Sequence, residues 1–228
     1  MCGRTSLFFH LEDLESRFEA THESPETYEP RYNIAPEQSL DVITGRAPEM
    51  ITRQHWGIVP FWADSSEDAG WINARSETAA EKPAFRQAWQ RRPCLVPSTG
   101  FYEWQAANGG AKQSYRIHRP DDLFAMAGLW DHWEGEDGEE LYSVTILTTD
   151  ANSLMEPIHD RMPVILPEED EVAWLNATAE ERHAYCQAYP GDDLEAHPIS
   201  KSVNNPGNDT ATIINPLDAE QTGLDSFT

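Results

Sequence analysis

Hydrophobic positions in the first part of the chain change from helical to strand spacing. Residues 10–20 (HLEDLESRFEA) repeat apolar side chains at helical spacing and predict a short amphipathic helix. Residues 39–44 and 49–56 are typical of strands, with a turn at residues 45–48. The aromatic segment at 56–62 (WGIVPFW) contains a proline, which favours a loop over the interior of a strand.

Strand-like segments dominate the rest of the chain. Pro83 fits the first turn of a helix running to residue 92. Segments rich in β-branched and aromatic residues predict strands at 94–104, 114–119, 123–130 and 141–149. The NGG sequence at 108–110 favours a hairpin turn.

The C-terminal third predicts a mixture of elements and a tail. In chain order, we expect a helical turn at 151–156, the apolar segment 158–166, acidic helices near 168–176 and 178–188, and a polar, frayed tail at 218–228. Strands dominate without regular alternation of strand and helix. The pattern therefore predicts one α+β domain over residues 2–217, built around a mainly antiparallel sheet with flanking helices.

Composition narrows the class of protein. The chain of 228 residues is long enough for one sizeable core. It has no apolar run long enough to span a membrane, and the start MCGRTSLFFHLEDLE does not fit a secretory signal. Its three cysteines cannot all pair with one another and match no zinc pattern. We expect a cytoplasmic monomer without membrane association, metal or cofactor.

The charge balance is strongly acidic. Forty Asp and Glu against sixteen Lys and Arg give a net charge of -24, yet eight Trp and 39% hydrophobic residues argue against disorder. A dense acidic surface suits a protein adapted to high salt, where its self-repulsion is screened. The alternative is an ordinary acidic cytosolic protein.

This acidity argues against nucleic acid binding, because phosphate contacts normally need Lys and Arg. The basic residues are unevenly distributed, however. Arg182 is the one Lys or Arg between residues 167 and 195, whereas ten of the sixteen precede residue 93: Arg4, Arg17, Arg31, Arg46, Arg53, Arg75, Lys82, Arg86, Arg91 and Arg92. A basic groove on an acidic body is compatible with this distribution.

Cys2 has distinctive chemistry if Met1 is removed. The new N-terminus would carry an α-amine and a thiol on adjacent carbons, both partly nucleophilic near neutral pH. An aldehyde could form a Schiff base with the amine, and the thiol could close on the imine to give a thiazolidine. An internal cysteine cannot do this, because its nitrogen lies in a peptide bond. The alternative is a frayed terminus with an incidental cysteine.

Glu103 and His159 are candidates for proton transfer. Glu103 lies in the aromatic segment GFYEW, and burial among aromatic rings raises a carboxyl pKa toward acid–base use. Strand alternation allows the alternative that Glu103 faces solvent. His159 in EPIHDRMP can shuttle protons near pH 7, although a lone histidine is more often structural.

The segment INARSET (72–78) offers groups for binding. Asn73 can donate to an oxyanion or a sugar hydroxyl, and Arg75 can hold a phosphate. The alternative is a helix N-cap at Ser76 supported by Glu77. The aromatic residues at 56–62 could stack on unpaired bases, or could simply form core.

Together these segments resemble the SOS-response-associated peptidase-like (SRAP) family, whose members shield abasic sites in single-stranded DNA. The resemblance covers nearly the whole chain and rests on MCGR (1–4), RYNIAP (31–36), WGIVPFW (56–62), INARSET (72–78), CLVPSTGFYEW (94–104), AGLW (127–130), IHDRMPVIL (158–166) and HPISKSVNN (197–205). It implies a compact, barrel-like, β-rich α+β fold with a groove for single-stranded DNA containing abasic sites.

The resemblance also implies roles for individual residues. Cys2 would form the thiazolidine crosslink, Asn73 would orient the sugar, and Glu103 would act as acid and base in ring opening and Schiff-base formation. His159 would assist proton transfer and stabilise or reverse the crosslink. The implied DNA-binding residues are Arg4, Asn33, Pro36, Phe61, Trp62, Arg75 and Arg161, with the arginines on phosphates and Pro36, Phe61 and Trp62 against bases.

Three activities fit these features. The first is a crosslinking enzyme with lyase-type Schiff-base chemistry, preceded by possible self-removal of Met1. The second is a thiol autopeptidase or protease with Cys2 as nucleophile and His159 as base. The third is a non-covalent module that binds single-stranded DNA through its aromatic residues and arginines.

Overall fold

Two sheets make up most of the computed structural model, which describes residues 2–66, 70–106 and 112–217. The five-stranded sheet has the order β14 (Glu195–Ile199), β9 (Gln113–His118), β8 (Gly100–Gln105), β1 (Thr5–Leu7) and β3 (Arg31–Ile34). The larger sheet contains β12 (Arg161–Pro163), β11 (Glu140–Asp150), β10 (Phe124–Glu134), β7 (Pro93–Ser98), β4 (Ser39–Thr44), β5 (Ala47–Trp56) and β2 (Thr21–His22), together with β13 (Ile165–Leu166) and β6 (Asn73–Arg75).

The larger sheet closes on itself. Strands β11, β10, β7, β4 and β5 pair in that order, and β5 then pairs in parallel with β11 through His55 and Trp56. These strands therefore form a closed five-stranded barrel, because the first and last members are hydrogen-bonded to one another. Most pairings in both sheets are antiparallel, so the predicted α+β class and the mainly antiparallel, barrel-like sheet are confirmed.

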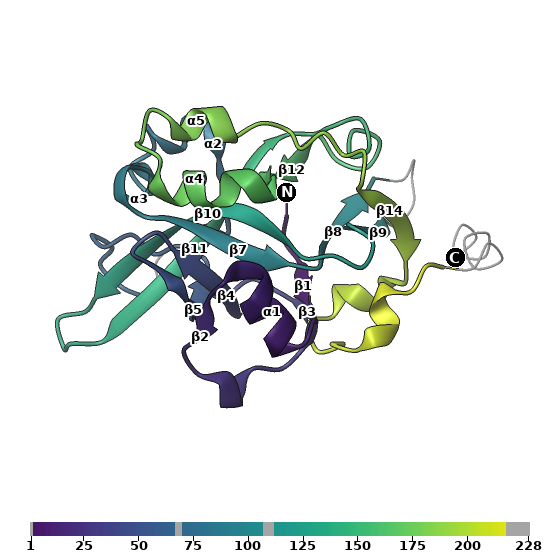
Figure 1. The fold of residues 1–228 in the computed structure, drawn as a ribbon, viewed down its shortest axis with the longest axis horizontal. Helices are drawn as coiled ribbons and strands as arrows, with labels where there is room; N and C mark the ends of the chain where they lie inside the picture. Colours follow the sequence, from purple (N-terminus) through teal and green to yellow (C-terminus); the bar gives the residue numbers. More distant parts are fainter. Residues whose placement is uncertain (1, 67–69, 107–111, 218–228) are drawn as a thin grey trace.

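Short helices flank the sheets. They are α1 (Leu11–Phe18), α2 (Ser76–Ala79), α3 (Arg86–Arg91), α4 (Glu168–Asn176) and α5 (Arg182–Tyr185), with 3-10 helices η1 (Pro25–Thr27), η2 (Lys201–Asn204) and η3 (Ala211–Ile214). In Figure 1, α3, α4 and α5 lie above the barrel, and β1 lies between the barrel and strands β8, β9 and β14. None of the described helices is long and apolar enough to cross a membrane.

The core fills the barrel and continues under the helices. Strand β7 is buried at every position, and Trp56, Trp89 and Trp174 are among the largest fully buried side chains. Leu14 of α1 packs into the same core, as its helical spacing predicts. Burial of apolar side chains in and around the barrel is therefore the main favourable contribution to the free energy of folding.

Several predicted boundaries are wrong for identifiable reasons. Segment 94–104 is two strands in different sheets, because Gly100 adopts a φ of +153° where the chain leaves the barrel. The helix predicted from Pro83 begins at Arg86, since residues 83–85 form a turn. The second acidic helix is shortened to α5. The predicted turn at 108–110 and tail at 218–228 lie outside the described residues.

Gly128 marks a position where the barrel interior has no room for a side chain. A Cβ added there would lie 2.8 Å from Cys94 Sγ and 3.1 Å from both Thr145 O and Val96 Cγ2. We predict that Gly128→Ala lowers the free energy of unfolding by about 1–3 kcal/mol, measured by denaturant titration. Val172→Ala is the control, because Val172 is 70% exposed. Its effect should stay within about 0.5 kcal/mol, and equal losses in the two variants would contradict the packing argument.

Candidate functional site

Strand β1 brings Cys2 next to Glu103. Thr5 pairs with Phe101 and Ser6 with Gly100 in the antiparallel ladder between β1 and β8. The same register continues toward the N-terminus, where the Tyr102 amide donates to the Arg4 carbonyl over 3.0 Å. Counting onward along the two strands places Gly3 opposite Glu103 and Cys2 opposite Trp104, so that Cys2 is a diagonal neighbour of Glu103.

The Cys2 thiol is buried and held in its neutral form. Its side chain is 0% exposed, and Sγ lies 3.9 Å from the Arg4 carbonyl oxygen. Burial, and then the negative charge of Glu103, raise the pKa of the Cys2 thiol to about 12. The thiol is therefore a poor nucleophile until a neighbouring base accepts its proton.

Glu103 is a buried carboxyl group. It is 2% exposed, so the alternative of a solvent-facing strand residue is wrong. Burial raises the pKa of Glu103, and an electrostatic interaction with His159 opposes this shift. A raised pKa makes a carboxyl group a stronger base, and it is the direction of shift that general acid–base catalysis by a carboxyl group uses.

Asn73 holds the main chain of Cys2. Its Nδ2 donates to the Cys2 carbonyl oxygen over 2.7 Å. Strand β6, which carries Asn73, pairs in parallel with β11 beside Ile146. The barrel wall thus fixes the Asn73 amide, and the amide fixes the position of Cys2. The alternative of a side-chain cap at Ser76 is wrong, because Ser76 is the first residue of α2 and Arg75 stands at the N-cap position.

His159 reaches the site from the loop before β12. Its backbone amide donates to Met155 O over 2.8 Å, and Gln105 Nε2 donates to Pro157 O over 2.7 Å, which ties this loop to the end of β8. The imidazole Nδ1 accepts from the Arg161 amide and lies 2.9 Å from Asp160 Oδ1. The loop therefore brings His159 into electrostatic contact with Glu103.

Two of the predicted phosphate-binding arginines lie in the interior instead. Arg4 is 8% exposed, and its guanidinium donates to Asn33 Oδ1 over 2.6 Å and to the Val203 carbonyl. Arg161 is 6% exposed and forms a bidentate pair with Glu77 at 2.7 and 2.9 Å. Protein groups thus hold both side chains, that of Arg4 two residues from Cys2 and that of Arg161 two residues from His159. Arg75 is exposed.

Asn33 likewise has structural contacts. Its Nδ2 donates to the carbonyls of residues 203, 205 and 208, at 3.3, 3.1 and 2.7 Å. Asn33 and Arg4 therefore anchor the C-terminal segment to β3 and β1. This network was not predicted from the sequence. Its partners are about 170 or more positions apart, and no local sequence pattern indicates such pairs.

Exposed aromatic residues lie on the loop that leads to Asn73. Phe61 is 45% and Trp62 is 50% exposed, and Trp71, which sequence reasoning missed, is 40% exposed. An isolated bridge between Ile58 and Trp71 closes this loop. The alternative that Phe61 and Trp62 form buried core is therefore wrong. Pro36 is partly buried at the end of β3.

Comparison with known proteins decides the family. The model of the SOS response associated peptidase (SRAP) family matches residues 1–206. The chain belongs to the SRAP family. It is 40% identical to the abasic site processing protein YoqW of Bacillus subtilis (strain 168), with 94% of this chain and 99% of that protein covered. It is 31% identical to the abasic site processing protein HMCES of Rattus norvegicus, over 96% of this chain and 76% of that protein.

Solved structures share the SRAP fold of this chain. A crystal structure of a protein from Bacteroides thetaiotaomicron superimposes with a TM-score of 0.87 at 30% identity, covering 95% of this chain and all of the other. A protein from Bordetella bronchiseptica superimposes with a TM-score of 0.77 at 28% identity, over 87% of this chain. The fold of this chain is therefore shared with these two solved structures.

The charge of Glu103 gives a test of the geometry of this SRAP site. We predict that Glu103→Gln lowers the pKa of the Cys2 thiol, because the substitution removes a negative charge that disfavours the thiolate. The ¹³Cβ chemical shift of labelled cysteine, followed against pH, reports this pKa directly. Cys186 serves as an internal control, because Glu103 is not among the groups that shift its pKa. An unchanged Cys2 titration would show that the two side chains do not interact.

Proposed function

We propose that this protein senses abasic sites in single-stranded DNA and shields them by covalent capture at Cys2 after Met1 is removed. The observation that carries the proposal is the arrangement of Cys2, which lies beside the buried Glu103 while Asn73 holds its carbonyl group. The names of the relatives, which are abasic site processing proteins, support the same substrate.

The proposed reaction is balanced without a cofactor. The Cys2 α-amine condenses with the aldehyde of the ring-opened sugar and releases water, which gives a Schiff base. The Cys2 sulfur then bonds to the imine carbon, and the thiol proton ends on the nitrogen of the thiazolidine ring. As the sugar opens, Glu103 donates a proton to the ring oxygen and takes back the proton of the anomeric hydroxyl. As water departs, it donates a proton to the leaving hydroxyl and takes one back from the amine nitrogen. As the ring closes, it passes the thiol proton to that nitrogen.

Other groups of the site would position these partners. Asn73 fixes the Cys2 main chain, and His159 supplies a second proton-carrying group beside Glu103. The exposed rings of Phe61 and Trp62 would stack against unpaired bases, and Arg75 would contact a phosphate. Arg4 and Arg161 would act mainly by keeping β1 and the His159 loop in place, since both guanidinium groups are buried against protein partners.

Substitution of Cys2 separates ring formation from Schiff-base formation. With single-stranded DNA bearing an abasic site, the parent protein should give an adduct that survives heating in denaturant without reductant. Cys2→Ala should give none, although borohydride should still trap a Schiff base through its α-amine. Denaturing gels measure both species. Cys186→Ala is the matched control, because it removes a buried thiol remote from the ladder of β1 and β8.

Equal amounts of heat-resistant adduct from Cys2→Ala and the parent would contradict the proposed crosslink. Normal binding of abasic DNA without any adduct from the parent would instead favour the non-covalent module. Turnover of a peptide supplied in trans would favour the protease.

Glu103→Gln should slow crosslinking even though it makes the thiol more acidic. The amide keeps the shape of the carboxyl group but cannot transfer a proton, so the rate of adduct formation should fall by about 100-fold. Initial rates from quenched time courses measure this loss. An unchanged or faster rate would show that the thiolate alone limits the reaction and that Glu103 is no acid–base catalyst.

A further inference from the structure

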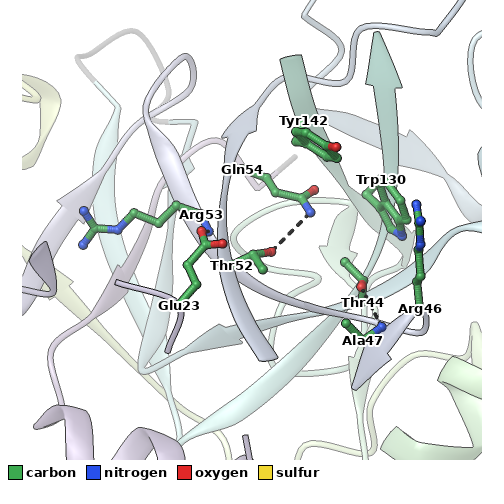
Figure 2. A pocket seen from close by; sticks show the side chains of 9 residues that line it. All are labelled: Glu23, Thr44, Arg46, Ala47, Thr52, Arg53, Gln54, Trp130 and Tyr142. Atoms are coloured by element: carbon green, nitrogen blue, oxygen red, sulfur yellow. Dashed lines mark hydrogen bonds between the residues drawn. The ribbon is translucent and has the colours of Figure 1, made fainter. Parts of the chain in front are cut away.

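Two adjoining cavities lie outside the Cys2 site, on the barrel surface around the β4–β5 turn and the β10–β11 hairpin. The first, of about 500 Å³, is lined by Thr44, Arg46, Gln54, Trp130 and Tyr142 among others (Figure 2). The second, of about 400 Å³, also includes Arg46 and Trp130 and adds Arg91, Arg92 and Arg182. Because they share two residues, the cavities form one surface, which we name the arginine–aromatic groove.

The groove gathers positive charge on a protein with a net charge of -24. Arg46 and Arg91 are exposed, and neither has an ion-pair partner in the part of the chain that the structure describes. Burial, together with the charges of Arg46 and Arg91, lowers the pKa of Arg92. The three guanidinium groups thus repel one another, and a bound anion would offset that repulsion.

Aromatic rings form the other side of the groove. Tyr142 is 43% exposed and stacks on His132 with ring centroids 4.4 Å apart and on Trp130 at 6.3 Å. The guanidinium of Arg92 lies over the Trp130 ring at 5.2 Å. The ring of Tyr142 therefore offers a fixed, partly exposed surface on which a planar group can stack.

Two buried polar atoms border the first cavity without hydrogen-bond partners among the described residues. They are Oε1 of Gln54, a residue that is 4% exposed, and Nε1 of Trp130, which is 5% exposed. Figure 2 shows the Gln54 amide turned toward the rings of Trp130 and Tyr142. An acceptor and a donor beside an aromatic surface match the edge and face of a nucleobase.

We propose that the arginine–aromatic groove is a second nucleic acid site, which binds an undamaged single strand. An unpaired base would stack on Tyr142 and meet Gln54 and Trp130, while backbone phosphates would lie between Arg46, Arg91 and Arg92. A duplex does not fit this arrangement, because its base faces are already stacked. A free nucleotide carries the same chemistry.

Asp131 joins the groove to the loop that carries Phe61 and Trp62. One carboxylate oxygen pairs with Arg92, and the other accepts from the Phe61 amide over 3.3 Å. One buried carboxylate therefore connects an arginine of the groove to this aromatic loop.

The test uses Cys2→Ala protein and a labelled oligothymidylate without an abasic site, so that binding is measured apart from crosslinking. Fluorescence anisotropy should show that adding Arg46→Gln and Arg91→Gln together weakens binding about tenfold and lowers the slope of log K against log salt by about 1.4. Tyr142→Ala should weaken binding about tenfold.

The matched control pair is Lys82→Gln with Arg86→Gln, which removes equal charge from exposed positions outside the groove and should bind as the parent does.

Thermal unfolding of each variant separates loss of binding from loss of fold. Competition by thymidine monophosphate would identify a single nucleotide as sufficient, and competition by unlabelled strand alone would identify the strand. Competition by neither, equal losses in the control pair, or unchanged binding in both groove variants would overturn the proposal. A negative result for the groove would not bear on the proposed crosslink, because crosslinking is measured with abasic DNA and intact Cys2.

Discussion

The antiparallel ladder between β1 and β8 is the constraint on which the candidate site depends. It places the residues that precede Thr5 alongside those that follow Tyr102, so Cys2 and Glu103 meet although they are about a hundred positions apart. Arg4 and Asn33 hold the C-terminal segment over β1 and β3, and Asn73 fixes the Cys2 carbonyl from the barrel side. A terminus that would otherwise fray is thereby held in a defined position, which chemistry at a chain end requires.

Burial gives the site its electrostatic character. Burial raises the pKa of the Cys2 thiol and of the Glu103 carboxyl group, and so disfavours the charged form of each. In the proposed reaction, an aldehyde held next to the amine and the carboxyl group would be placed to react with them. The ion pair between Arg161 and Glu77 fixes the start of β12. It thereby also holds the loop that carries His159.

The local sequence pattern predicted which helices and strands form better than it predicted where they end or which remote residues their side chains contact. The spacing in residues 10–20 and the strand composition of 39–56 predicted α1, β4 and β5, since these elements follow from which side chains face the core. The break at Gly100 was missed because it depends on a backbone angle, and the roles of Arg4 and Asn33 were missed because their partners are remote in sequence. The four residues predicted for catalysis do come together. Their proposed roles, and adaptation to high salt, remain predictions.

The most direct test of covalent capture is the intact mass of the protein before and after incubation with an oligonucleotide that contains one abasic site. If Cys2 captures the abasic site, the protein should have lost Met1 and should then gain the mass of the oligonucleotide less one water, as closure of a thiazolidine requires. Loss of Met1 without an adduct, or an adduct on protein that retains Met1, would contradict covalent capture at Cys2.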